Sequence, residues 1–211
     1  MTKTLGIALL WCAGLALAAE PRITYIKQFP GSSPAYIGIT VERNGKTVYT
    51  EAAKDDYPLE FKLTQSEADE IFDLAGKLDK FTRPLESGLK VANMGTKTFR
   101  FEDGAVKNEQ KFNYSLDEHA KALHDWFEKI AETEQHYIRL ERTVKYDHLG
   151  VNQALLLFQI AWDKKRVVAP EQYLPLLDRV AKNDTYMNMA RERAAILAEA
   201  IRGLQKQAKS E

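Results

Sequence analysis

The stretch YIGITVERNGKTVYT, from Tyr36 to Thr50, carries the clearest structural signal in this sequence. Ile37, Ile39 and Val41 alternate with smaller or polar residues, and a second alternating run follows Asn44-Gly45. Such alternation is typical of strands with one buried face, and Asn-Gly between two of them favours a type I′ hairpin turn, because both residues tolerate a positive φ. The stretch therefore predicts an antiparallel hairpin.

The segments around this hairpin extend the predicted sheet. Arg22–Phe29 also alternates, which predicts a third strand before the hairpin. Asp103-Gly104 separates the strand-like segments Thr96–Phe101 and Ala105–Tyr114, which indicates a second hairpin. We expect a small antiparallel sheet of about five strands in two hairpin groups.

Two capping-box patterns mark predicted helix starts. Thr64-Gln-Ser-Glu67 precedes an apolar stripe that ends near Leu78, and Ser115-Leu-Asp-Glu118 precedes a longer periodic segment. In that segment apolar residues recur every seven positions, which is typical of a coiled-coil-like seam, although Thr133 interrupts it. The pattern leaves open whether residues 116–148 form one helix or two. The seam positions are Leu116, His119, Leu123, Trp126, Ile130, Thr133, Tyr137, Leu140 and Val144.

The C-terminal part of the chain is expected to be all helical. Val151–Trp162 is apolar nearly all round, which predicts a helix buried between others, and a stripe from Ala190 to Leu204 predicts the last helix. Strands followed by helices indicate an α+β fold. We predict an α+β domain over residues 20–132 and a helical segment over residues 133–211 that packs on it or extends it.

The N-terminus has the pattern of a secretory signal peptide. A positive Lys3 precedes the apolar run Leu5–Leu17, and Ala16-Leu17-Ala18 is a small-x-small cleavage site. An uncleaved anchor is the alternative, but the run is shorter than the ~20 residues of a membrane-spanning helix. We predict a signal peptide over residues 1–18, cleaved after Ala18 or Ala19, and export to the bacterial periplasm or exterior.

Composition excludes several classes of function. The 30 Lys and Arg residues balance the 30 Asp and Glu residues, so no basic footprint for nucleic acid is present. Cys12, the one cysteine, lies within the predicted signal peptide, so the exported chain would have no disulfide and no cysteine chemistry. Glycine-rich phosphate-binding motifs and the serine-hydrolase motif are also absent from the sequence. We therefore predict no cofactor, no catalytic residue set and no membrane span in the exported chain.

The loop FPGSSPAY, Phe29–Tyr36, lies between two predicted strands and contains two of the candidate binding residues, Ser32 and Ser33. Neither serine has the neighbours that would activate a nucleophile, so a surface loop for binding is the remaining functional interpretation. Tyr25, Tyr36 and Tyr49 are further binding candidates. They would lie close together on the first strands, where either cross-strand packing or an exposed aromatic face could result.

The histidines offer a weaker hint of chemistry. His124, Glu128, Glu132 and His136 are spaced by four, so neighbours in this row lie one helical turn apart, where a histidine and a carboxylate could bind a metal. The row lies away from the apolar seam, where solvent is expected, and a third ligand is missing. We therefore predict no metal site.

The run from Ile23 to about Ile130 resembles an uncharacterised family of bacterial extracytoplasmic domains. That family has a Cys-Phe-Gly-x-Cys-Pro-x-Tyr segment after its first strand, and Gly31, Pro34 and Tyr36 match it here. Phe29 and Ser33 stand where the family has cysteines. The match continues in Gly45 and Tyr49 of the hairpin and in the helix segment LTQSEADEIFDLAGKLDKF. The resemblance implies the fold and the extracytoplasmic location, the loss of any cysteine chemistry, and no particular activity.

These observations favour a non-enzymatic binding or interaction protein of the bacterial envelope. Its partner would be another envelope protein or a second copy of the chain, docked through the helical part. One alternative is an extracytoplasmic hydrolase of peptide or glycan that uses His124 or His136 with nearby carboxylates. Another is a small inhibitor or ligand-binding module that uses the sheet face, which an exposed aromatic face around Tyr25 and Tyr49 would favour.

Overall fold

The computed structural model describes residues 20–208, and the predicted signal peptide lies outside these residues. Six strands form one antiparallel sheet in the order β4-β3-β2-β1-β5-β6. The strands are β1 (Arg22–Gln28), β2 (Tyr36–Glu42), β3 (Lys46–Thr50), β4 (Leu59–Lys62), β5 (Thr96–Asp103) and β6 (Val106–Phe112). Because β1 pairs with both β2 and β5, the two predicted hairpin groups are joined in one sheet.

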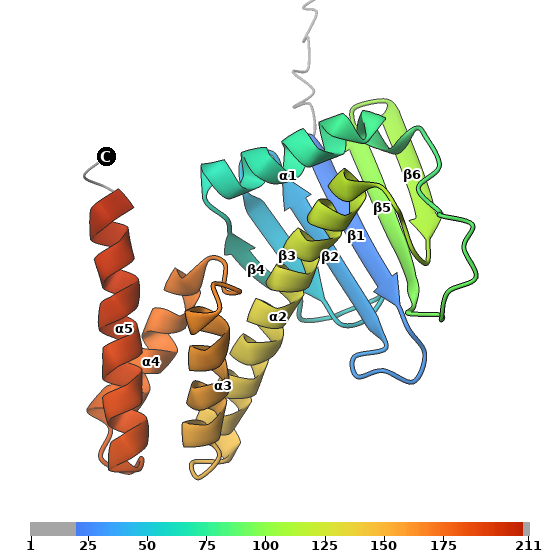
Figure 1. Cartoon of the computed structure of the whole chain (residues 1–211). Coiled ribbons are helices and arrows are strands. Elements are labelled where there is room, and N and C mark those ends of the chain that lie inside the picture. Colours follow the sequence, from blue (N-terminus) through green and yellow to red (C-terminus); the bar gives the residue numbers. More distant parts are fainter. Residues whose placement is uncertain (1–19, 209–211) are drawn as a thin grey trace, which may run out of the picture.

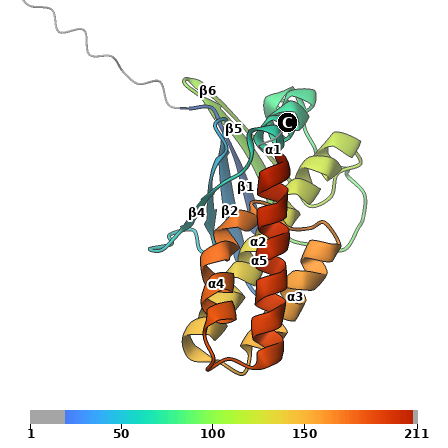
Figure 2. The ribbon, with the colours of Figure 1, turned by 90° about the vertical axis from the view of Figure 1, so that its left-hand side faces the viewer.

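Five α-helices complete the α+β fold that the sequence predicts. They are α1 (Gln65–Lys77), α2 (Glu118–Tyr146), α3 (Val151–Asp163), α4 (Leu174–Lys182) and α5 (Asn188–Ala208), with 3₁₀ turns at Asp79–Phe81 and Pro170–Tyr173. Figure 1 shows α1 and α2 lying across the sheet, while α3, α4 and α5 gather beside the second half of α2. In the edge-on view of Figure 2 the helices lie on one side of the sheet, and no described element covers its other face.

The predicted β2–β3 hairpin forms, but with a different turn. β2 and β3 pair antiparallel, with Val41 opposite Thr47, and the loop between them has three residues, 43–45. Gly45 has a φ of +85°, whereas Asn44 does not have a positive φ. A type I′ turn needs positive φ at both central residues, so the predicted turn type is wrong; the geometry is a turn closed by one left-handed glycine.

The two faces of the sheet differ in character, as the alternation predicts. One face carries the first hydrophobic core, with Ile23, Ile39 and Phe99 fully buried beneath α1 and α2. The open face carries polar pairs such as Thr24 with Thr40, whose hydroxyl oxygens lie 3.2 Å apart. Functional groups that face the helices are therefore screened from water, whereas those on the open face are not.

One of the two predicted capping boxes is present. Thr64 caps α1, and Glu67 accepts a hydrogen bond from the Thr64 backbone N–H, which confirms the first box. At α2 the N-cap is Asp117, whose Oδ1 accepts from the backbone N–H groups of the second and third following residues. Ser115 lies outside the helix and accepts from the backbone N–H of Asp117, so the second predicted box is wrong.

Helix α2 is a single helix that belongs to two hydrophobic cores. Leu123 and Ile130 lie in the first core, with the sheet and α1, whereas Leu140 and Val144 lie in a second core with α3, α4 and α5. From Leu123 to Val144 the apolar seam is therefore filled by the protein's own chain, so the coiled-coil interpretation is wrong for this part; Leu116, before the helix, is 55% exposed. The domain boundary predicted between residues 132 and 133 falls inside this continuous helix.

Helix α3 is less buried than predicted. Val151, Leu155 and Phe158 are buried in the second core, but Ile160 is 40% exposed. α3 packs against α2 and α5, which leaves a third side open to solvent. None of the helices within residues 20–208 is both long and apolar enough to cross a membrane.

Candidate functional site

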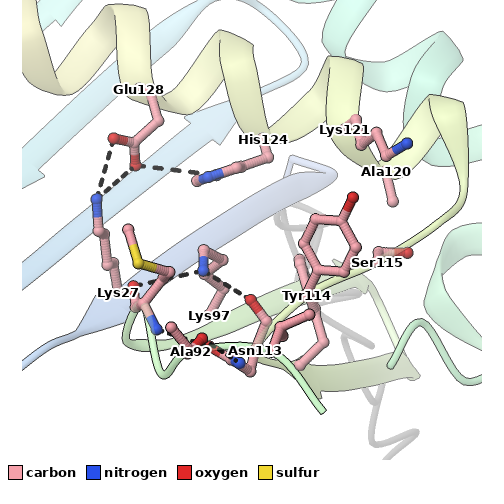
Figure 3. Close-up of a pocket in the computed structure, with 13 residues that line it drawn as sticks. Lys27, Ala92, Lys97, Asn113, Tyr114, Ser115, Ala120, Lys121, His124 and Glu128 are labelled. Carbon is pink, nitrogen blue, oxygen red and sulfur yellow. Dashed lines mark hydrogen bonds and ion pairs between the residues drawn. The ribbon is translucent and has the colours of Figure 1, made fainter. Parts of the chain in front are cut away.

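The α2 cavity, of about 550 Å³, lies where the first half of α2 crosses the ends of β5 and β6. Figure 3 shows it with Lys27, His124 and Glu128 at one end and Lys121 at the other. Its lining side chains are Lys27 from β1; Val91, Ala92 and Met94 from the loop before β5; Lys97 from β5; Phe112 from β6; Asn113, Tyr114 and Ser115 after β6; and Ala120, Lys121, His124 and Glu128 at and near the start of α2.

Two lysines occupy core-facing positions of the sheet beneath α2. Lys27 follows Ile23 and Tyr25 at spacing two, so it points to the helix side, and Lys97 precedes Phe99 in the same way. The register pairs Lys27 directly with Lys97 across β1 and β5. Two ammonium groups at adjacent core-facing positions are costly to bury, so each must have polar partners.

Glu128 neutralises one of these lysines. Both of its carboxylate oxygens accept a hydrogen bond from Lys27 Nζ at 3.0 Å, and Oε1 also accepts from the Tyr25 hydroxyl at 3.0 Å. Tyr25 is fully buried and its ring stacks on Phe127 with 4.8 Å between centroids, so its hydroxyl is held firmly. Burial and the adjacent Glu128 carboxylate raise the pKa of Tyr25, so it stays a protonated donor.

His124 completes this network. Its Nδ1 lies 3.2 Å from the Tyr25 oxygen. Since the Tyr25 proton is donated to Glu128, we assign the proton between Tyr25 and His124 to Nδ1. Burial, opposed by the Glu128 carboxylate, lowers the pKa of His124, so the ring is neutral near pH 7. Its Nε2 is then an acceptor on the cavity wall, with no hydrogen-bond partner among the described residues.

Lys97 holds the loop before β5 in place. It is 6% exposed, and its Nζ donates to the backbone oxygens of Asn113 at 2.8 Å, Gly95 at 3.3 Å and Met94 at 3.5 Å. Asn113 holds the same loop from the other side, accepting from the Met94 backbone N–H and donating to the Ala92 oxygen. Burial and the neighbouring Lys27 ammonium lower the pKa of Lys97. These contacts fix the loop that forms one wall of the cavity.

The three tyrosine candidates do not gather into one exposed patch. Tyr25 and Tyr49 are 0% and 1% exposed and face the helices. Tyr36 lies at the start of β2 on the open face, opposite Gln28. The exposed aromatic face that would favour a sheet-face binding module is therefore missing around Tyr25 and Tyr49, because the strand alternation turns both rings into the core.

The serine candidates lie in a second, smaller hollow of about 240 Å³. Ser32 and Ser33 line it together with Lys27 and Glu128, which also line the α2 cavity. The Ser32 hydroxyl lies 2.7 Å from the backbone oxygens of both Phe29 and Pro34, so it braces the loop.

The sequence interpretation expected the row of histidines and carboxylates on α2 to be a solvated face. The structure shows instead that members of this row contact other parts of the protein. His124 and Glu128 point toward the sheet, and Glu132 accepts a hydrogen bond from Arg166 at 3.0 Å. His136 lines neither of the two cavities. Within residues 20–208 no three His, Cys, Asp or Glu side chains come close enough together to hold a metal ion.

Sequence reasoning missed Lys27 and Lys97 as site residues. The signal was available, because each lysine continues the apolar positions of an alternating strand, where a charged residue is unusual unless it is paired. The partner of Lys27, Glu128, lies 101 residues away on a helix, so no local pattern joins them.

No protein-family model matches the chain, and no curated protein matches it either. The resemblance to the cysteine-bearing extracytoplasmic family therefore stays a prediction.

Proposed function

We propose that this protein is a non-enzymatic, exported binding protein of the bacterial envelope, whose α2 cavity holds a small molecule with an apolar body. Ligand sites in proteins are concave, mostly apolar, and carry a few convergent polar groups. The α2 cavity has this composition, with Lys27, His124 and Glu128 converging at one end. This cavity is the observation on which the proposal rests.

Exposed apolar side chains at the cavity wall support the proposal. Val91, Met94 and Tyr114 line the cavity and are 42%, 60% and 39% exposed. The loop that carries Val91 and Met94 is held in place by Lys97 and Asn113, so these two side chains are presented by a fixed backbone. A ligand with an apolar body would cover them and gain the free energy of removing that surface from water.

The proposed place of action rests on the N-terminal sequence, which favours export to the periplasm or exterior. We no longer propose that a partner docks on the seam of the long helix, because the two hydrophobic cores occupy that seam from Leu123 to Val144.

Binding of three eight-carbon probes tests the proposal: octanoate, 1-octanol and octylammonium, each titrated into ¹⁵N-labelled protein and followed by NMR. At least one probe should shift the amide signals of residues 91–97 and 113–124. Ala92→Trp fills the cavity from an exposed position and should abolish these shifts. Ala105→Trp, on the β5–β6 turn, is the matched control and should leave them unchanged. If no probe binds, or if Ala92→Trp binds as well as the unaltered chain, the cavity is not a ligand site.

A hydrolase is the second candidate, because the neutral His124 presents a free Nε2 to the cavity. Nε2 could take a proton from water as the hydroxyl adds to an ester carbonyl, while the Tyr25 hydroxyl, oriented by Glu128, holds the ring at Nδ1. Tyr25 is the one hydroxyl hydrogen-bonded to His124 within residues 20–208, so no serine or threonine nucleophile is positioned. Release of p-nitrophenolate from p-nitrophenyl octanoate that disappears in His124→Gln would favour the hydrolase over the binding protein.

A further inference from the structure

We infer that the α2 cavity selects a monoanionic ligand, a carboxylate or similar group on an apolar body, and that Lys27 is the residue that binds the anion. This inference rests on the proposed function, since it names the ligand class of the same cavity.

The charges that line the cavity do not balance. Lys27, Lys97 and Lys121 contribute three ammonium groups, whereas Glu128 contributes the one carboxylate. Lys121 is paired with Glu118, which lies outside the cavity, at 2.8 Å. Glu128 is paired with Lys27 and so balances one of the two remaining ammonium groups, which leaves the cavity lining with an excess of one positive charge. A bound monoanion would neutralise this excess, whereas a cation would increase it.

Lys27 and Lys97 differ in how many N–H donors remain free to bind a ligand. An ammonium group has three N–H donors. Lys97 has three backbone oxygens around it, so its donors are occupied. Lys27 directs its hydrogen bonds to the two oxygens of a single carboxylate, which leaves at least one N–H for another acceptor. Lys27 is therefore the available anion partner.

The position of Lys27 suits a ligand with an apolar body. Its side chain is 24% exposed, so it is reached from the cavity but is partly shielded from water. Hydrogen bonds between charged groups are stronger than those between neutral groups, and their strength increases further where water is excluded. The anionic group would lie at this end, and the apolar body would extend toward Val91, Met94 and Phe112.

The three eight-carbon probes separate this inference from the proposed function, because they share one apolar body and differ in charge. Octanoate should bind about tenfold more tightly than 1-octanol, the size expected from one hydrogen bond to a charged group, and octylammonium should bind most weakly. Equal binding of octanoate and 1-octanol would overturn the anion inference and leave the binding function intact. No binding by any probe would overturn both.

Two substitutions at the same ion pair should change octanoate affinity in opposite directions. Lys27→Gln removes the anion partner and should weaken binding about tenfold. Glu128→Gln releases Lys27 and increases the positive excess, so it should strengthen binding severalfold. The exposed pair Lys46 and Glu60, 3.2 Å apart on β3 and β4, gives matched controls in Lys46→Gln and Glu60→Gln, which should change nothing. If both variants at the cavity weaken binding, the ion pair is only structural and the inference is wrong.

Discussion

At the scale of single residues, Gly45 shows how tightly the first hairpin is specified. Its φ is +85°, and a Cβ at this position would lie 2.6 Å from the backbone oxygen of Leu63. Gly45 also accepts a hydrogen bond from the Leu63 backbone N–H at 3.0 Å, so the contact cannot open without cost. The turn glycine thus fixes both the hairpin and the approach of the chain to α1.

Gly45→Ala should lower the free energy of unfolding by about 1–3 kcal/mol, since it adds backbone strain to a steric clash. Urea unfolding followed by circular dichroism measures this change. Gly76→Ala is the control: Gly76 lies in α1 with open space around it, and helix propensity predicts a gain of up to about 1 kcal/mol. A tolerated alanine at residue 45 would contradict the turn geometry described above.

Glu134 makes the stability of the fold depend on pH. Its side chain is 0% exposed, one oxygen accepts from Gln172 at 2.8 Å, and Oε2 has no partner within the described chain. Burial raises the pKa of Glu134 from 4.5 to about 7. The folded protein therefore binds a proton that the unfolded chain has lost between these values. Stability falls as pH rises through this window, by about 3 kcal/mol, and stays lower above it.

Glu134→Gln should remove this dependence, because the neutral amide keeps the shape and the acceptor for Gln172. We expect the variant to be about 1–3 kcal/mol more stable than the unaltered chain at pH 8 and to differ little from it at pH 5. Urea unfolding at the two pH values gives the comparison. Glu141→Gln, at an exposed position of the same helix, is the control. A Glu134→Gln variant that is less stable at pH 8 would contradict this account.

At the scale of helices and strands, the start of α2 depends on Asp117. Its carboxylate caps two backbone N–H groups and also accepts from Arg83 at 2.7 Å. Asp117→Ala should therefore lower the free energy of unfolding by about 1–2 kcal/mol. Glu118→Ala, which the capping-box pattern would make equally damaging, should cost less than about 0.5 kcal/mol, since that side chain is 82% exposed. Thermal unfolding of the two variants distinguishes the Asp117 cap from the predicted capping box of Ser115 and Glu118.

Local signals predicted the elements that depend on local interactions. The β2–β3 hairpin and the α1 capping box involve residues a few positions apart, so the sequence shows them directly. The four-residue strand β4 was missed because Leu59–Lys62 is too short to show alternation and is defined by its pairing with β3. The cap of α2 was assigned two residues early, because Ser115 and Asp117 are both good caps and only tertiary contacts decide between them.

The strand alternation could have marked Lys27 and Lys97, but the meeting of the site residues was out of reach of local patterns. Tyr25, Lys27, His124 and Glu128 come together because β1 lies beneath α2, and the sequence gives no measure of that crossing. Heptad spacing placed His124 and Glu128 away from the seam and hence in solvent. The seam, however, faces two cores in turn, and the sheet covers a wider side of α2 than a coiled-coil partner would.

At the scale of the whole molecule, helix α2 connects the two hydrophobic cores through its 29 residues. Further links join them: Val168 belongs to the first core, and its backbone N–H donates to Thr133 in the middle of α2 at 3.2 Å. Tyr173, in the second core, donates to the backbone oxygen of Thr133. Fraying of either core would therefore unravel part of the helix that the other core needs.

The two cores should unfold in one transition. Trp126 packs against the first core and Trp162 against the second, so variants that keep only one of these tryptophans report on each core separately. The two fluorescence transitions in urea should share one midpoint and agree with the circular dichroism signal. Midpoints that differ by about 0.5 M urea or more would show that the cores unfold independently.

The strand order also decides how the molecule behaves at high concentration. β4 and β6 are the edges of the sheet, and free edges can pair with strands of other molecules. β4 has four residues and carries Glu60 and Lys62, while Lys107, Glu109 and Lys111 alternate along β6. A second chain that added to either edge would have to desolvate these charges, so the sheet is protected against growing into aggregates.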